Sequence, residues 1–195
     1  MYGGMIMNVD KEGNDEFDRF VAYSNTLLVN RQNHSGETPN FVLKCADFFE
    51  SKIATDGEFC PCVNFQMGLK RATTHNATGE LRADGSLKSE DVFVALRIGS
   101  WTPYVTNALA NQDKGPAKIQ IFQLINRSNK QETIHEWTFE TCKVKRTRYT
   151  YQGFFFSFAY SKFTDLDKAS KQDGTAKGNI GFEFNFETLE SAAIS

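Results

Sequence analysis

The sequence predicts a mainly β fold, an antiparallel barrel or tight sandwich with one short α-helix and an N-terminal arm, and two observations carry this prediction. Phenylalanine occurs 18 times in 195 residues, while proline occurs only 4 times. The stretch from residue 118 to residue 163 consists of β-branched and aromatic runs that polar turn residues separate. Because an isolated hairpin is marginally stable in water, strands with this much apolar surface require a further layer that covers them.

Three strands are expected in this stretch. The first covers residues 118–126 and ends at the turn formers NRSNKQ, and the second covers residues 134–151. After the turn at Gln152-Gly153, the third covers residues 154–163 and is aromatic at nearly every position. A strand that is apolar on both faces is covered on both faces, so we expect one side in the barrel and the other against the helix or a neighbouring protomer. The residues predicted to pack between protomers are Phe154, Phe156 and Phe158.

Residues 1–40 differ in character from residues 41–195, which form the β domain. Asn14 or Asp15 is a candidate cap for a short helix whose apolar positions recur near one stripe. We expect this helix to be a docking arm that covers part of the barrel or of a neighbouring subunit. Its stripe contains Phe17, Phe20, Val21, Ser24, Leu27 and Leu28.

One further helix and several strands complete the prediction. Thr102 is the expected N-cap and Pro103 the first helical residue, and Gly115-Pro116 marks the end. Its apolar stripe contains Val105, Ala108 and Leu109. Buried strands are expected at residues 41–46, from residue 60 or 63 to about 69, and at residues 91–98.

The C-terminal part is expected to be a polar connection, residues 165–178, followed by one closing strand. In that strand the apolar and polar residues alternate strictly, which predicts that one side is buried and the other faces water or a lumen. The apolar side consists of Ile180, Phe182, Phe184 and Phe186.

The sequence contains no catalytic or metal-binding motif of a known kind. There is no G-x-S-x-G, no H-E-x-x-H and no glycine-rich phosphate cradle, so no enzyme activity and no cofactor are predicted. Cys60 and Cys62 form the one close cysteine pair, and a zinc site would need two more ligands. We therefore expect the four cysteines to be small core residues in a reducing compartment and predict no metal.

The charge balance argues against a nucleic-acid protein, because the formal net charge is −2. The basic run Lys143, Lys145, Arg146 and Arg148 with nearby tyrosines could serve a single-stranded nucleic acid. A solvated or lumen-facing strand with acids opposite it is the favoured interpretation. The first residues have no signal-peptide pattern and no apolar run of membrane-spanning length, so we expect assembly in the cytoplasm and no membrane insertion.

From Phe41 onward the order of elements resembles the Hcp family, which forms the tube of bacterial type VI secretion systems and is related in fold to phage tail-tube proteins. The first similar segment is FVLKCADFFESKIATDGEFCPCVNFQMGL, and the second is DVFVALRIGSWTPYVTNALANQDKGPAKIQIFQLIN. The third is EWTFETCKVKRTRYTYQGFFFSFAYSKF, so the resemblance spans roughly residues 41–188. Residues 1–40, the long loop between Cys60 and Trp101 and the closing strand at 178–188 depart from the family pattern.

The resemblance implies a structural subunit that forms rings, expected to be hexameric, which stack into a tube. It also implies effector proteins in the lumen, contacts with a spike and a sheath, and release from the cell without a signal peptide. The polar segment 70–90 lacks aromatic residues and carries both charge signs, so we expect it to touch the next ring. Its candidate stacking residues are Arg71, His75, Asn76, Arg82, Asp84 and Lys88. The alternative from another class is a monomeric β-barrel that binds a small apolar ligand.

Overall fold

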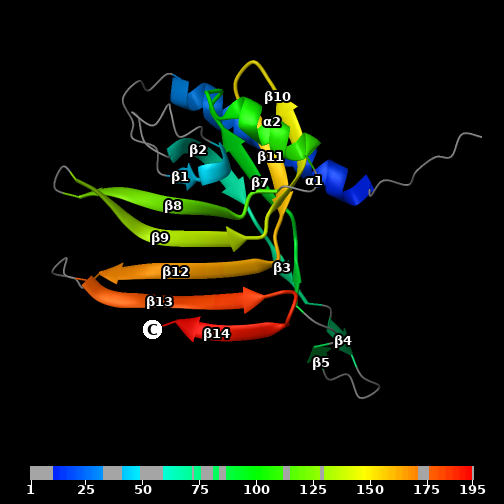
Figure 1. The fold of residues 1–195 in the computed structure, drawn as a ribbon, viewed down its shortest axis with the longest axis vertical. Helices are drawn as coiled ribbons and strands as arrows, with labels where there is room; N and C mark the ends of the chain where they lie inside the picture. Colours follow the sequence, from blue (N-terminus) through cyan, green and yellow to red (C-terminus); the bar gives the residue numbers. More distant parts are fainter. Residues whose placement is uncertain are drawn as a thin grey trace, which may run out of the picture.

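The computed structural model describes residues 11–32, 41–48, 59–71, 73–75, 81–83, 87–111, 115–127, 130–170 and 176–194 (Figure 1). Most of these residues lie in β-strands. The helical elements are α1 (Lys11–Gln32), η1 (Ala46–Phe48) and α2 (Thr102–Ala110). The strands are β1 (Phe41–Lys44), β2 (Phe59–Gln66), β3 (Leu69–Lys70), β4 (Thr73–His75), β5 (Leu81–Ala83), β6 (Lys88–Ser89), β7 (Val92–Leu96), β8 (Lys118–Arg127), β9 (Lys130–Glu140), β10 (Lys143–Tyr149), β11 (Phe154–Ala159), β12 (Lys162–Ser170), β13 (Ala176–Asn185) and β14 (Glu190–Ile194).

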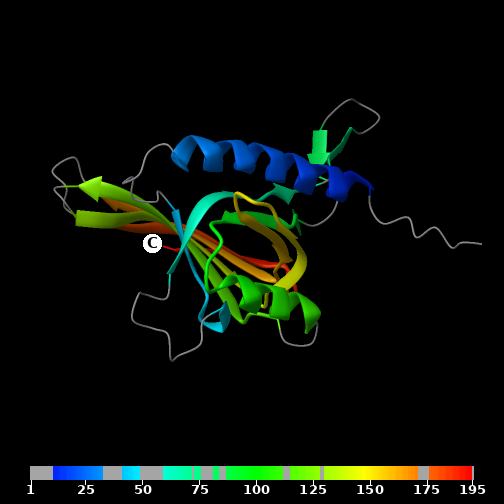
Figure 2. The same ribbon diagram turned by 90° about the horizontal axis from the view of Figure 1, so that it is seen from above.

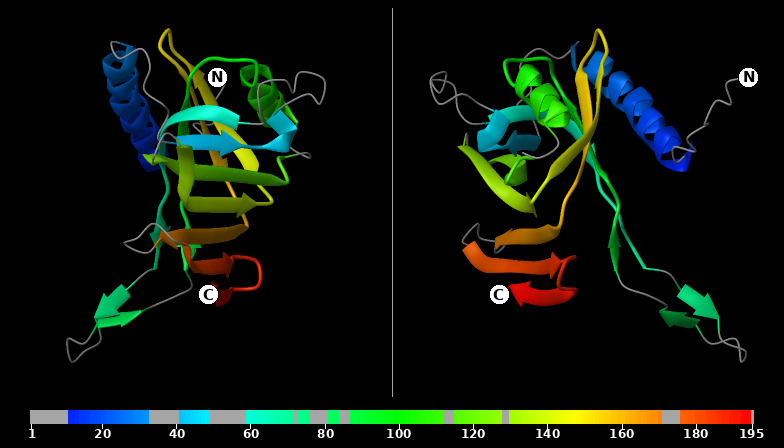
Figure 3. Two further views of the ribbon diagram at one scale, coloured as in Figure 1. Left: turned by 90° about the vertical axis from the view of Figure 1, so that its left-hand side faces the viewer. Right: turned by 45° about the vertical axis from the view of Figure 1, so that its right-hand side comes forward.

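One antiparallel sheet of ten strands forms the body of the molecule. Its order is β10-β11-β7-β2-β1-β8-β9-β12-β13-β14, and four shorter strands form two separate pairs. The sheet curls so that its first seven strands enclose a core, while β12, β13 and β14 continue below it (Figure 3). The two ends of the sheet, β10 and β14, do not pair with each other, so the barrel is open. The predicted mainly β fold of barrel or sandwich type is therefore confirmed.

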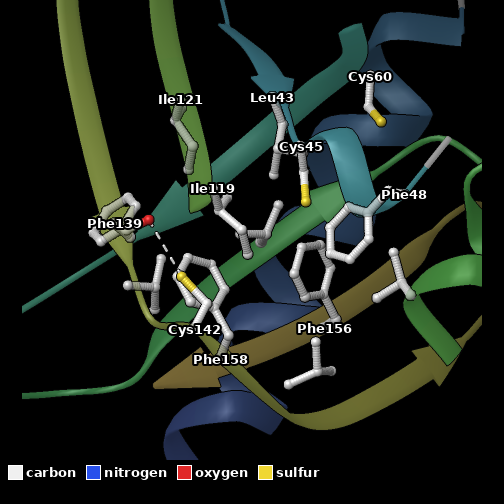
Figure 4. Close-up of a cluster of buried hydrophobic side chains, with 14 of the residues drawn as sticks. Leu43, Cys45, Phe48, Cys60, Ile119, Ile121, Phe139, Cys142, Phe156 and Phe158 are labelled. Atoms are coloured by element: carbon white, nitrogen blue, oxygen red, sulfur yellow. Dashed lines mark hydrogen bonds between the residues drawn. The ribbon is translucent and has the colours of Figure 1, made fainter. Parts of the chain in front are cut away.

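The enclosed core is built from apolar side chains on the inner face of the curled sheet (Figure 4). Phe139 contacts Phe158 edge-on, with ring centroids 5.3 Å apart, and Phe48 contacts Phe156 in the same way at 5.9 Å. The core also contains Cys45, Cys60 and Cys142 as free thiols. All three are buried, as the sequence predicted, and the Cys142 thiol donates a hydrogen bond to the carbonyl of Phe139 at 3.4 Å.

Helix α1 packs on the outer face of the sheet, on the side of the barrel opposite to α2 (Figure 2). The predicted stripe is confirmed, because its aromatic and aliphatic residues are buried except Leu27, which is partly buried. The helix is longer than predicted and already includes Asn14 and Asp15. On the sheet it covers Val63, Phe93 and Phe155 together with Ala95. Within this protomer the arm therefore docks on its own barrel.

Two of the predicted strands are interrupted. The stretch 134–151 is split into β9 and β10 at Thr141, whose φ of 53° is left-handed, and the stretch 154–163 is split at Tyr160 and Ser161. Both breaks follow from the pairing: β9 pairs with β12, whereas the β10–β11 hairpin leaves this group and joins β7. The apolar positions shift by one residue at both breaks, from Phe139 to Cys142 and from Tyr160 to Phe163, and this shift is a local sign of the interruption that the prediction overlooked.

The C-terminal prediction is corrected in two respects. Residues 165–178 are largely strand and not a connection, because β12 and β13 form a long hairpin. A further strand, β14, follows the closing strand. The polar side chains of β12 are compatible with a strand because the outer face of this hairpin is exposed to water. On that face Lys162 Nζ lies 3.0 Å from Glu183 Oε1.

Helix α2 is confirmed where it was predicted. Val105 is fully buried, while Ala108 and Leu109 are partly buried against the core. The capping detail differs, since Thr102 is the first helical residue and not the cap. Its hydroxyl accepts a hydrogen bond from the backbone N–H of Gly99 at 3.1 Å. In the part of the chain that the structure describes, neither helix is long and apolar enough to cross a membrane.

Candidate assembly surfaces

The predicted stacking segment forms a hairpin that stands away from the barrel (Figures 1 and 3). We call residues 69–89 the protruding hairpin. Its base is the pair β3–β6, and its outer part is the pair β4–β5, so the predicted loop contains short strands. The base is fixed on the barrel by the hydrogen bond from Glu90 N to Gly68 O, 2.9 Å, and by the ion pair from Lys70 Nζ to Glu90 Oε1, 3.1 Å.

The six candidate stacking residues are distributed along this hairpin. Arg71 and Lys88 are exposed near its base. His75 lies in β4 opposite Leu81, and Arg82 lies in β5 opposite Thr74. Asn76 and Asp84 fall outside the described residues. A hairpin brings the two halves of the segment together, which a disordered loop would not do, and gives a defined projection from one end of the barrel.

Lys145 and Arg148 of the basic run on β10 form ion pairs within the chain. Lys145 Nζ lies 2.9 Å from Asp91 Oδ2, and Arg148 Nη1 lies 2.6 Å from Asp18 Oδ1 on α1. The guanidinium groups of Arg146 and Arg148 lie over the ring of Phe17, at 5.9 and 5.8 Å from its centroid. These contacts agree with the interpretation that acids face the run, and Arg148 also helps to dock α1.

The residues predicted to pack between protomers lie inside the protomer. Phe154, Phe156 and Phe158 have 0% exposure and belong to the barrel core. Since a side chain without exposed surface touches no second subunit, this prediction is corrected. The opposite face of β11 carries Phe155, which α1 covers, so helix and core together explain why the strand is apolar on both faces.

Metal and thiol chemistry find no support at these surfaces. Among the described residues, no group of three or more histidine, cysteine or acidic side chains is arranged to hold a metal ion. Burial raises the pKa of the Cys45 thiol to about 12, and burial likewise raises that of Cys142 to about 12. Both thiols are therefore protonated at neutral pH and are poor nucleophiles and poor ligands.

A surface that sequence reasoning missed lies on the C-terminal wing, which we define as residues 162–194 (β12, β13 and β14). The apolar side of β13 is buried at Phe184, with 6% exposure, but Ile180 is 63% exposed and Phe182 is 37% exposed. The prediction that this side is buried therefore holds only at the end of the strand near the barrel. Strict alternation identified the face correctly, although it does not reveal where the covering layer ends.

Comparisons with known proteins identify the fold through structure. No family model matches the sequence, and no curated protein matches it. A solved structure described as a type six secretion system protein has a TM-score of 0.66 at 14% identity, covering 80% of this chain and 100% of that chain. Hcp1 from Salmonella typhimurium gives 0.57 at 12% identity, covering 78% and 97%, and Hcp1 from the E. coli EAEC 042 pathovar gives 0.54 at 16% identity, covering 75% and 96%. This chain thus has the fold of the Hcp proteins of type VI secretion systems.

Proposed function

We propose that this protein is a structural subunit of the tube of a type VI secretion system. The observation that carries the proposal is the shared fold, which covers 80% of this chain and the whole of a solved type six secretion system protein. In this proposal protomers join side by side into a hexameric ring, and rings stack into a tube that is expelled and holds effector proteins in its lumen. Spike and sheath proteins are the other expected partners.

The protruding hairpin supports stacking. It extends from one end of the barrel, its side chains at Arg71 and Lys88 are exposed, and it contains no aromatic residue. Exposed ion pairs contribute only about 0–1 kcal/mol each and are screened by salt. Stacking through such contacts becomes strong because a ring presents several copies of the hairpin at once.

The alternative of a barrel that binds a small apolar ligand receives less support. The barrel interior is filled by side chains without exposed surface, such as Phe139, Phe156 and Ile119. A pocket of about 290 Å³ is lined by residues of α2 and β10, among them Leu109 and Val144. A ligand-binding barrel needs an internal cavity, so a structural role agrees better with this packing.

Deletion of residues 74–87 tests the proposal by electron microscopy. The intact protein is expected to form rings and tubes, and the deletion variant single rings without tubes. A matched control exchanges Arg71 and Lys88 for glutamine in the full-length hairpin, and its stacking should weaken and lose part of its salt dependence. An intact protein that stays monomeric at all concentrations contradicts the tube proposal, whereas a deletion variant that dissociates into monomers shows that the hairpin makes lateral contacts.

A further inference from the structure

The exposed apolar residues of the C-terminal wing lie on a continuation of the core face. Phe184 pairs with Phe163, which belongs to the barrel core. Phe182 and Ile180 follow at two-residue intervals on the same face, opposite Asp165 and Asp167. Among the described elements, only the neighbouring strands β12 and β14 make extensive contacts with β13. The inner face of the wing therefore carries Phe182 and Ile180 beside two carboxylates, of which Asp165 pairs with His135, and the described elements place no second layer on it beyond Phe184.

The outer face of the wing has a different character. Lys162 Nζ lies 3.0 Å from Glu183 Oε1, and Lys168 Nζ lies 3.3 Å from Glu136 Oε2. The hydrogen bond that Lys162 donates to Glu183 raises the pKa of Lys162. Paired charges of this kind suit a face in contact with water, whereas the inner face exposes the large apolar side chains of Ile180 and Phe182.

A second apolar patch lies on the outer face of the barrel, on β1, β2 and β8. Leu43 points into the core, so Val42 and Lys44 on either side of it point outward. Val42 pairs with Phe122 and with Pro61. Phe59, 44% exposed, contacts Phe122 edge-on with ring centroids 6.0 Å apart. We call Val42, Phe59, Pro61 and Phe122 the outer patch.

The inner face of the wing and the outer patch are both apolar in part and carry charges of opposite sign. The inner face of the wing carries carboxylates beside its apolar residues, with Asp167 directly opposite Ile180. The outer patch carries an ammonium group, because Lys44 Nζ lies 5.4 Å from the centroid of the Phe59 ring. The two surfaces differ from each other, and a head-to-tail contact that repeats around a closed ring requires two different surfaces on each subunit.

We propose that the inner face of the wing, through Ile180 and Phe182, packs on the outer patch of the next copy of this chain and forms the lateral contact of the ring. This inference rests on the proposed function and specifies the partner surfaces. In this contact the wing, which extends past its own barrel, lays its inner face on the convex outer surface of the neighbouring barrel. The carboxylate of Asp167 then approaches the ammonium group of Lys44 of the next copy.

Two single variants test the contact by size-exclusion chromatography with light scattering. Ile180→Glu places a charge on the wing, and Phe122→Glu places one on the outer patch. Each variant is expected to lose the ring and to elute as a folded monomer, with circular dichroism as the check on folding. Leu189→Glu is the matched control. Leu189 is 57% exposed, lies in the turn between β13 and β14 and belongs to neither of the two surfaces. It should retain the ring.

Mixing the two variants distinguishes a head-to-tail contact from other arrangements. Ile180→Glu retains an intact outer patch, and Phe122→Glu retains an intact wing, so one contact can form between them and no more. The mixture should give a 1:1 dimer with twice the mass of the 22.0 kDa chain. Variants that still form rings, or a mixture of folded variants that stays monomeric, overturn this inference and leave the tube proposal standing if the unaltered protein forms rings. If the unaltered protein itself is monomeric, the proposed function fails.

Discussion

Replacing Phe20 with alanine tests whether α1 is an integral layer of the fold. Phe20 is 3% exposed and lies 5.7 Å, centroid to centroid, from the ring of Phe93 on β7. Truncation of a buried phenylalanine costs about 3–5 kcal/mol, which includes the loss of an aromatic pair. In a chain of this size, 1 kcal/mol corresponds to about 2–4 °C in the melting temperature. We therefore expect Phe20→Ala to lower the melting temperature by about 6–20 °C.

The assay is thermal unfolding followed by circular dichroism, with Tyr23→Ala as the control on the same helix. Tyr23 is 62% exposed, so its truncation should change stability by no more than about 0.5 kcal/mol. The effect of Phe20→Ala should also be independent of protein concentration, since the helix docks on its own barrel. Equal melting temperatures for both variants would refute the docking, and a concentration-dependent midpoint would show that α1 packs on another copy.

Three other predictions concern stability. Val105→Ala should cost about 1.5–3 kcal/mol in denaturant unfolding because Val105 is fully buried, and Leu109→Ala should cost less because Leu109 is only partly buried. Thr141→Gly should raise the denaturation midpoint, since a left-handed φ of 53° costs a β-branched residue about 1–3 kcal/mol; a lowered midpoint would contradict this strain. The pKa of Cys45 and Cys142 rises from 9.0 to about 12 on folding, so the unfolded chain ionises first. Stability should be intact below pH 9 and fall between pH 9 and 12, and Cys45→Ala/Cys142→Ala should reduce that fall.

The parts of the fold that sequence reasoning identified are those with a local signal. The stripe of α1 repeats at helical spacing, Pro103 marks the start of α2, and the alternation in β13 identifies its apolar face. Each of these patterns depends on residues within one element. They needed no knowledge of what lies next to the element in space.

The parts that it missed depend on distant contacts. The break at Thr141 arises because β9 and β10 belong to different parts of the sheet. The shift of the apolar positions from Phe139 to Cys142 marks the break, but no residue near it identifies β12 or β7 as the strands that the two halves join. The sequence predicts a protomer contact for Phe154, Phe156 and Phe158, because a strand that is apolar on both faces must be covered on both faces. The sequence does not state that the curled sheet supplies one of them and α1 the other. The exposed wing was missed for the same reason, since burial of Ile180 depends on how far the barrel extends.

The place of β10 and β11 in the sheet has a consequence for the order of folding. Glu140 and Lys162 pair with each other, and the Ser161 N–H donates a hydrogen bond to the Glu140 carbonyl at 3.1 Å, so the 21 residues between these two form a closed excursion. Closing a loop of this length carries a modest entropic cost that grows only slowly with length. The meander β8-β9-β12-β13-β14 can thus form early from contacts near in sequence, while β11 must find β7 some sixty residues away. In refolding with pulsed hydrogen exchange, amides of β9 and β12 are therefore expected to gain protection before those of β7 and β11.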